Sequence, residues 1–594
     1  MNNQVSRLLD VNFPDPNHSN FNLGRKNTFS ADVGYLYPIY VEEVLASSYK
    51  KLDLEALVQC NATVAPVMGS FTTKVEAYFV PIRLYHQHLL NNDRSNNFAD
   101  DFELHYFPWL HYSDQSSGTV KTNTVSPTDS SRLPFISSAG SLVEYLGMYP
   151  TGFNSCSWTN NGTSPRINAY PFIGYFDIFR NYYSNPYDTS IPFRVNNSLV
   201  LGADFATSAD GIVSLNIFDK FINGIRTSSL NSSGTPVPVN VFESFCRYFK
   251  YIKDQVSYPV PLFANTESPA RTYTLNGIHF GLLRRTYKDD YFNARISSDF
   301  VTYLKEQSRV QVNNNTFDIT QLRLANRIAK YVDKLGFSDS RFGSWLKAHF
   351  GTKLNDRMQI PQFLGSMSST LVFQDIISNA QTGDSDVVTS NEALGSRAGL
   401  GSGYMKNQGS FIEFKAVEPG YIIVLFSIVP NVSYTQGIRK MYLKSRFSDI
   451  YTPEFDAVGY QDLHKVEMSA IGYHFSGNPN LQGPLYFGNY NTVVGKHPSW
   501  MEYMTSIDES HGLVTEYGQY GYWTLNRPFD PGAYFDILTG SSSVEPNIDV
   551  STYIRPEYFN QIFAVNRLTD NFQVQFRFYD KTSQPMSKQV LPRL

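Results

Sequence analysis

The chain has 594 residues, more than the ~250–300 at which one compact core stops growing, so we expect several domains or one domain with very long loops. Aromatic residues make up 15% and charged residues only 17%, a composition typical of a loop-rich β protein with large buried contacts. The formal net charge of −4 excludes a protein that neutralises packaged DNA by itself, because phosphate binding depends on Lys and Arg.

The first thirty residues are rich in Asn, Pro and Ser, which predicts an extended N-terminal arm over residues 1–30. They contain no apolar signal core, so we expect no secretion. Both ends of the chain are expected to be flexible and are basic in character, and their cations are candidate contacts to the phosphates of a nucleic acid. These candidates are Arg7, Arg25, Lys26, Lys588 and Arg593. The alternative is that these are ordinary solvated terminal charges.

Three segments far apart in the chain have the patterns of β-strands. In Phe71–Phe79 and in Phe572–Phe578, apolar and polar residues alternate, as they do in a half-buried strand. Gly420–Val429 is almost continuously apolar, which predicts a strand buried on both faces. This run is far shorter than the ~20 residues of a membrane-spanning helix, so we expect no membrane insertion. We predict that all three strands belong to one Greek-key or jelly-roll barrel.

Long segments of low order separate these strands. We expect residues 31–594 to form one domain with large insertions at about 111–166 and 186–281. Ser141–Met148 predicts a short helix, since Ser141 and Glu144 are spaced as a capping box.

A second helix is predicted over Gln321–Leu335, where apolar residues recur at helical spacing and basic residues surround them. Such a helix could touch DNA or a membrane. The commoner alternative is a helix that lies on a core with solvated charges.

Motifs for catalysis are absent from the sequence, which contains no HExxH, GxxxxGK[ST] or GxSxG. His86 and His88, with Asp100 and Asp101 downstream, are the nearest approach to a metal cluster, but no third ligand follows at a known spacing. We therefore expect a surface or interface pair there, and neither a metal nor a cofactor.

Two further segments could bind a ligand, but we prefer a structural interpretation of each. Gly395–Gly403 could cradle phosphate through its backbone amides, but a flexible segment that adapts to its neighbours is the favoured interpretation. Thr382–Asp386 lacks the remaining ligands of a calcium loop and is interpreted as an exposed acidic turn. Cys60, Cys156 and Cys246 are odd in number and far apart, which predicts reduced thiols.

Several phrases in the N-terminal block have a recognisable pattern. They are Gly34-Tyr35-Leu36-Tyr37-Pro38 with Glu43-Val44-Leu45, Ala65-Pro66-Val67-Met68, and Tyr78-Phe79-Val80-Pro81-Ile82-Arg83. Together they resemble the N-terminal block of the major capsid proteins of microviruses, the small tailless phages with single-stranded DNA. Further blocks follow in that family's order, at Ile167–Tyr183, Leu282–Ala294, Leu322–Gly365, Glu418–Phe455 and Ile554–Ala564. The similarity is to the gokushovirus-like members and covers most of the chain. Between two of the matching blocks this chain has a large segment, Pro186–Gly281, that is extra to the family pattern.

The resemblance implies a mainly β fold, an eight-stranded antiparallel jelly roll with long inserted loops and a few short helices. It implies a structural protein without catalytic residues that assembles with itself, through pentameric intermediates, into a T=1 icosahedral shell around a circular single-stranded DNA genome. Implied partners are a small basic DNA-binding phage protein, a minor spike or pilot protein and a receptor on the bacterial surface. The implied location is the virion, assembled in the host cytoplasm, and we expect the extra segment to supply exterior relief.

Two hypotheses from other classes compete with this one. A secreted β-sandwich that binds or cleaves glycans could use Trp109, Trp158 and Trp523, but the sequence shows no pair of carboxylates for a glycosidase. A free-standing DNA-binding protein is opposed by the acidic charge balance.

Overall fold

The structure is a computed structural model. It describes residues 18–85, 107–110, 142–148, 167–184, 190–194, 211–214, 221–223, 225, 281–282, 284, 359–377, 397–406, 411–456, 459–469, 493–515, 520–529, 552–560, 562–564, 570–586 and 588.

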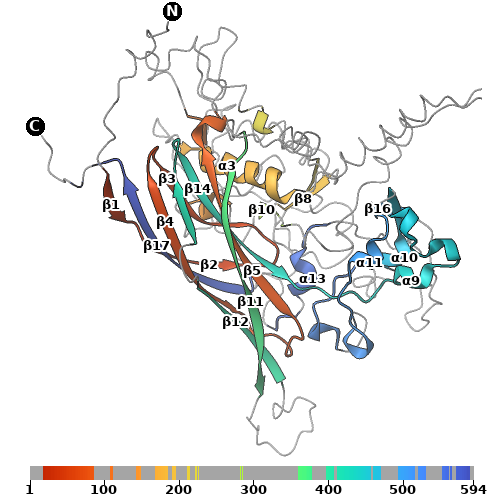
Figure 1. The fold of residues 1–594 in the computed structure, drawn as a ribbon. Coiled ribbons are helices and arrows are strands. Elements are labelled where there is room, and N and C mark those ends of the chain that lie inside the picture. Colours follow the sequence, from red (N-terminus) through yellow and green to blue (C-terminus); the bar gives the residue numbers. More distant parts are fainter. Residues whose placement is uncertain are drawn as a thin grey trace, which may run out of the picture.

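A curled antiparallel sheet of ten strands dominates the molecule (Figure 1). Eight of its strands follow one another along the chain as β2 (Arg25–Ala31), β3 (Tyr37–Val44), β4 (Tyr49–Cys60), β5 (Ser70–Pro81), β11 (Gln362–Ile377), β12 (Arg397–Lys406), β14 (Gly420–Pro430) and β17 (Phe572–Gln584). The two short strands β1 (Ser19–Asn22) and β13 (Ile412–Lys415) add to β17 and β4.

The pairing of the eight strands has a simple rule. The first pairs with the eighth, the second with the seventh, the third with the sixth and the fourth with the fifth: β2 with β17, β3 with β14, β4 with β12, and β5 with β11. This is the pattern of one long two-stranded ribbon. The ribbon is wrapped on itself by the further pairs β17 with β4, β14 with β5 and β11 with β12. Two Greek keys wound in this way make a jelly roll, so the predicted eight-stranded antiparallel fold is confirmed.

Side chains bridge the two ends of this strand order, where β2 approaches β3. The guanidinium of Arg25 donates to the Val41 carbonyl at 2.8 Å, and the amide of Asn27 donates to the Ile39 carbonyl at 2.8 Å. The short helix α2 (Leu142–Tyr145) lies beside this seam, where the Tyr145 ring is 5.1 Å from the ring of Tyr37. The predicted helix at 141–148 is therefore present over part of its length.

Alternation along the strands fills the barrel. Along β17 the residues Phe572, Val574, Phe576 and Phe578 are buried and the residues between them are exposed. The ring of Phe29 on β2 stacks on that of Phe576 at 6.0 Å, so the interior is built largely from aromatic side chains. The prediction that Phe71–Phe79, Gly420–Val429 and Phe572–Phe578 share one barrel is confirmed, because β5, β14 and β17 belong to the same sheet.

A helix explains why β14 is apolar along its whole length. The helix α3 (Tyr170–Ile178) lies over the sheet, and every one of its residues is buried (Figure 1). A Cβ on Gly174 would sit 3.2 Å from side-chain atoms of Ile423 and Val80, so helix and sheet are in close contact there. All residues of β14 are therefore buried, one face in the barrel and the other under α3.

The segment between β14 and β17 forms a lobe beside the barrel (Figure 1). It contains the hairpin-like pair β15 (Tyr460–His464) and β16 (Val493–Pro498). Short helical segments surround this pair: α9 (Lys440–Leu443), η6 (Phe447–Asp449), η7 (Pro453–Phe455), α10 (Lys465–Met468), α11 (Met501–Met504), η8 (Gly512–Val514) and η9 (Gly521–Trp523). After it, α13 (Pro556–Asn560) leads back toward β17.

The long segment between β5 and β11 contains the remaining elements. They are η2 (Ile82–Tyr85), β6 (Trp109–Leu110) paired with β7 (Ile167–Asn168), the π-helical turn η4 (Phe179–Tyr183), and a sheet of β8 (Ser190–Arg194), β9 (Gly211–Ser214) and β10 (Gly281–Leu282). Phe221 packs edge-on against Phe176 of α3 at 5.8 Å. The predicted helix at 321–335 and the acidic turn at 382–386 lie outside the described residues.

The interpretation of Gly395–Gly403 as a flexible segment is wrong, because residues 397–406 form β12 between β11 and β4. Gly399, Gly401 and Gly403 alternate along this strand. A Cβ on Gly401 would lie 2.7 Å from Leu371 and 2.8 Å from the Cys60 sulfur. Because glycine has no Cβ, these two side chains can pack closely against the Gly401 backbone inside the barrel. Within the predicted arm, residues 19–22 and 25–31 pair with β17 as β1 and β2. The division into arm and domain otherwise stays a prediction.

Candidate functional site

Three of the five predicted nucleic-acid contacts are among the described residues: Arg25 and Lys26 lie on β2, and Lys588 follows β17. Arg25 is exposed on β2, where its guanidinium is 3.2 Å from the Glu42 carboxylate and lies over the Tyr40 ring at 4.5 Å. Lys26 is exposed on β2, and the Lys588 ammonium lies 6.0 Å from the centre of the Phe21 ring on β1. Arg7 and Arg593 fall outside the described residues.

The strand register adds a cation that the sequence analysis missed. Lys26 is directly opposite Arg577 on β17, Arg577 is opposite Glu55 on β4, and Glu55 is opposite Lys406 on β12. Lys406 pairs with Glu55 at 2.7 Å, and Arg577 lies over the Tyr579 ring at 5.0 Å. We call Lys26, Arg577, Glu55 and Lys406 the cationic row. Polar alternation along β17 was the signal that could have placed Arg577 on the outer face of the sheet.

Metal chemistry finds no support in the described part of the chain, which holds no group of three or more potential ligands. His86, His88, Asp100 and Asp101 lie outside it. Cys60 is buried as a free thiol, and burial raises its pKa to about 11 even though the Gly401 amide donates to the sulfur at 3.0 Å. Such a thiol is unreactive at neutral pH. Cys156 and Cys246 lie outside the described residues, as does Trp158, and Trp523 is half-buried in η9.

None of the helices in the described ranges is long and apolar enough to cross a membrane.

A buried ion pair ties the cover of the barrel to the sheet. The guanidinium of Arg284 is 2.6 Å from the Glu76 carboxylate on β5 and donates to the Ser427 hydroxyl on β14 at 2.9 Å. The hydroxyl of Tyr183 on η4 also donates to Glu76, and its ring lies 5.1 Å from the Arg284 guanidinium. Burial alone would raise the pKa of Glu76, but the Arg284 charge and these hydrogen bonds outweigh it and hold that pKa below its usual range. The pair therefore contributes a fixed structural contact and offers no proton for chemistry.

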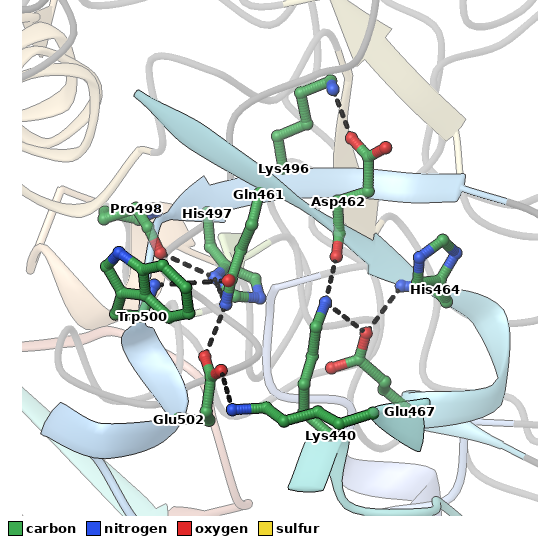
Figure 2. Close-up of polar contacts among 11 residues, drawn as sticks. Lys440, Gln461, Asp462, His464, Glu467, Lys496, His497, Pro498, Trp500 and Glu502 are labelled. Atoms are coloured by element: carbon green, nitrogen blue, oxygen red, sulfur yellow. Dashed lines mark hydrogen bonds and ion pairs between the residues drawn. The ribbon is translucent and has the colours of Figure 1, made fainter. Parts of the chain in front are cut away.

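The lobe between β14 and β17 is organised by a polar network (Figure 2). The Gln461 side chain on β15 donates to the Glu502 carboxylate at 2.7 Å and accepts from the Trp500 amide at 3.2 Å. On the other side of β15, the Lys440 ammonium donates to the Asp462 carbonyl at 2.7 Å and lies 3.2 Å from Glu467. These contacts hold α9, α10 and α11 against the strand pair.

His497 lies at the centre of this network and is fully buried. Its Nδ1 atom is 3.0 Å from the Pro498 carbonyl oxygen and 3.3 Å from the Gln461 side-chain nitrogen (Figure 2). Burial lowers the pKa of His497, because the charged imidazolium would lose its hydration. The lobe is therefore built around a neutral imidazole.

The outer side of the same lobe exposes large apolar side chains. None of α9, η6, η7 and α11 buries a residue. Phe447 is 92% exposed, and Tyr451 lies 6.0 Å from Tyr503 and 5.4 Å from Trp500. We call the exposed set on these segments the aromatic face. Its members are Tyr442, Phe447, Tyr451, Phe455, Tyr503 and Met504. Such a surface is suited to contact with another macromolecule, and it contains no arrangement for bond-making chemistry.

Comparison with known proteins gives a consistent result. A family model described as capsid protein (F protein) matches residues 14–592. The capsid protein VP1 of Chlamydia phage 1 is 22% identical over 565 residues, which cover 85% of this chain and 86% of that protein. The capsid protein VP1 of Bdellovibrio phage phiMH2K is 21% identical over 458 residues, 76% of each chain. That of Spiroplasma virus 4 is 21% identical over 534 residues, 85% of this chain and 88% of the relative.

These matches agree with the jelly roll and with the absence of catalytic motifs from the sequence. They confirm the resemblance, place the protein in the virion and assign it a structural role in place of the alternative glycan-binding one. The chain therefore belongs to the capsid protein (F protein) family of phages, as a major capsid protein of the microvirus type.

Proposed function

We propose that copies of this protein form a T=1 icosahedral shell, through pentameric intermediates, around a circular single-stranded DNA genome. The observation that carries the proposal is the ribbon pairing of the eight strands, with the described elements between β5 and β11 and between β14 and β17 lying outside the barrel. The barrel supplies a rigid wall element, and the segments inserted between strands are free to make the contacts between subunits.

DNA contact in this proposal is local. The cationic row offers Lys26 and Arg577 to phosphates, and Arg7, Lys588 and Arg593 remain candidates toward the chain ends. The net charge of −4 makes a separate small basic protein the main neutralising partner. A minor spike or pilot protein and a receptor on the host surface are the other partners. Residues 186–281 supply protrusions on the outer surface of the shell. The shell assembles in the host cytoplasm.

Expression of the full chain in a bacterium tests the proposal. We expect closed particles of one size in electron micrographs and a pentamer in sedimentation experiments before shells appear. Monomers at every concentration, or particles of higher triangulation number, would contradict it. Nucleic acid extracted from particles made during infection should be circular and single-stranded.

A further inference from the structure

We propose that the aromatic face on the lobe between β14 and β17 is a contact with a second copy of this chain across a two-fold axis. The inference rests on the proposed function, which requires contacts between copies, and adds which surface makes one of them.

The size of the surface is the first argument. Taking about 200 Å² for a fully exposed large side chain, the six residues of the aromatic face leave about 700 Å² accessible. The largest apolar patch on a typical monomer is about 300–600 Å². A stable interface buries about 800 Å² on each partner. The accessible area of the aromatic face is therefore comparable to the largest patches that monomers expose and close to what one half of an interface needs.

The rigidity of the surface is the second argument. The Trp500 indole donates to the Phe455 carbonyl at 2.8 Å, and the Lys444 ammonium donates to the Tyr503 hydroxyl at 2.9 Å while it pairs with Glu502 at 2.9 Å. Through Glu502 these contacts join the network around Gln461 (Figure 2). The aromatic side chains are thus held on a fixed support, so less conformational entropy is lost when a partner binds.

Charge selects the partner. Arg446 lies beside Phe447, where its charge contributes to lowering the pKa of Asp449, and Glu454 and Asp456 lie on either side of Phe455; no salt bridge joins Arg446, Glu454 or Asp456 to the described residues. DNA or an anionic membrane would be repelled by the carboxylates, and a uniformly basic partner by Arg446. A two-fold axis brings each patch against its own copy, so the cation of one subunit can meet the anions of the other.

The first test removes apolar area. Phe447→Ser should raise the dissociation constant of subunit pairs at least tenfold in analytical ultracentrifugation and reduce the yield of particles, because Phe447 is the most exposed large side chain of the aromatic face and buried aromatic side chains dominate such contacts. Val417, which precedes β14 and is 90% exposed, supplies the matched control. Val417→Ser should leave pairs and particles unchanged. Near-ultraviolet circular dichroism and the Tm of both variants check that the subunit is folded.

The second test exchanges charges. Arg446→Glu alone should weaken the pairs, as should Glu454→Lys combined with Asp456→Lys. All three substitutions in one chain should restore the pairs, since the exchanged charges then attract across the axis. Weakening without restoration would show that the aromatic face meets a different surface and would overturn the two-fold contact.

The outcomes separate this inference from the proposed function. If Phe447→Ser and the wild type form particles and pairs equally well, the inference fails and the shell-forming function stands. If the wild type forms no particles, the proposed function fails first.

Discussion

Lys50 and Asp580 form an ion pair in the interior of the barrel. The Lys50 ammonium is 2.9 Å from the Asp580 carboxylate, and the two side chains are 1% and 0% exposed. The hydroxyls of Tyr40 and Thr582 also donate to Asp580, each at 2.6 Å. Both residues occupy positions where the alternation of β4 and β17 would place an apolar side chain. The two strands therefore place opposite charges at buried positions, and these charges pair with each other.

Removing one charge of this pair should cost more stability than removing both. Lys50→Met leaves a buried carboxylate without its cation, and we expect a loss of about 3–5 kcal/mol in the free energy of unfolding. Lys50→Met with Asp580→Asn should recover most of the loss, because the hydroxyl donors keep an acceptor. Lys51→Met is the control, since Lys51 and Glu413 are half exposed and such pairs contribute about 0–1 kcal/mol. Urea denaturation of the unassembled subunit measures all three, and equal losses for Lys50→Met and Lys51→Met would contradict the prediction.

A methyl group on Gly401 should destabilise the barrel. The new Cβ would lie 2.7 Å from Leu371, 2.8 Å from the Cys60 sulfur and 2.9 Å from Phe373, so these neighbours must move. We expect Gly401→Ala to cost about 1–3 kcal/mol, as overpacking of a core does. Ser402→Ala on the exposed side of the same strand should change stability by less than about 0.5 kcal/mol. Thermal unfolding of both variants decides, and an unchanged Tm for Gly401→Ala would show that this part of β12 is not packed inside the barrel.

Cys60 should resist alkylation while the protein is folded. Its raised pKa of about 11, caused by burial, leaves almost no thiolate at pH 8, and its side chain is screened from reagents. Iodoacetamide at pH 8 should label Cys60 only after urea is added, as followed by mass spectrometry of its peptide. Rapid labelling in the absence of urea would be inconsistent with a buried thiol.

The lobe between β14 and β17 should lose stability as the pH falls below about 6.5, the ordinary pKa of histidine. Burial lowers the pKa of His497 in the folded state, so in this range the unfolded chain binds a proton that the folded lobe does not. The free energy of unfolding therefore decreases until the pH reaches the folded pKa and then levels off. The charges that face His497 are Lys440 on α9, Glu467 on α10 and Glu502 on α11, and burial outweighs the two carboxylates.

His497→Asn should flatten this pH dependence. His511→Asn is the control, because the His511 side chain is 81% exposed. Unfolding free energies at pH 7.5 and pH 5.5 provide the comparison. If the free energy of unfolding depends on pH in the same way in His497→Asn as in the wild type, the pH dependence arises from other groups.

Lys26 and Arg577 should contribute to DNA binding without sequence preference. Lys26→Glu with Arg577→Glu should weaken binding of the subunit to single-stranded DNA and reduce the slope of log affinity against log salt by roughly 1–2. Lys415→Glu on β13 should have little effect, because Lys415 lies opposite Tyr49 at the start of β4 and outside the cationic row. Fluorescence titrations at several salt concentrations measure the slope, and equal effects from both variants would remove the cationic row as a DNA contact.

The sequence by itself determined three strands of the barrel and the family. Alternation in Phe71–Phe79 and Phe572–Phe578 and the apolar run of β14 are local patterns, because side-chain direction in a strand has a period of two. Sequence phrases along most of the chain predicted the capsid family. Neither required knowledge of which strand pairs with which.

Only the tertiary structure decided what depends on partners far away in the chain. The segment around Gly401 is interpreted as flexible from its sequence alone. In the structure, Cys60 and Leu371, from two other strands, lie where a Gly401 side chain would be. Lys50 is buried beside Asp580, which lies more than five hundred residues later in the sequence, and no local pattern joins the two. The meaning of a polar residue or a glycine in a strand is set by the side chains across the barrel, and a one-dimensional pattern contains no information about that register.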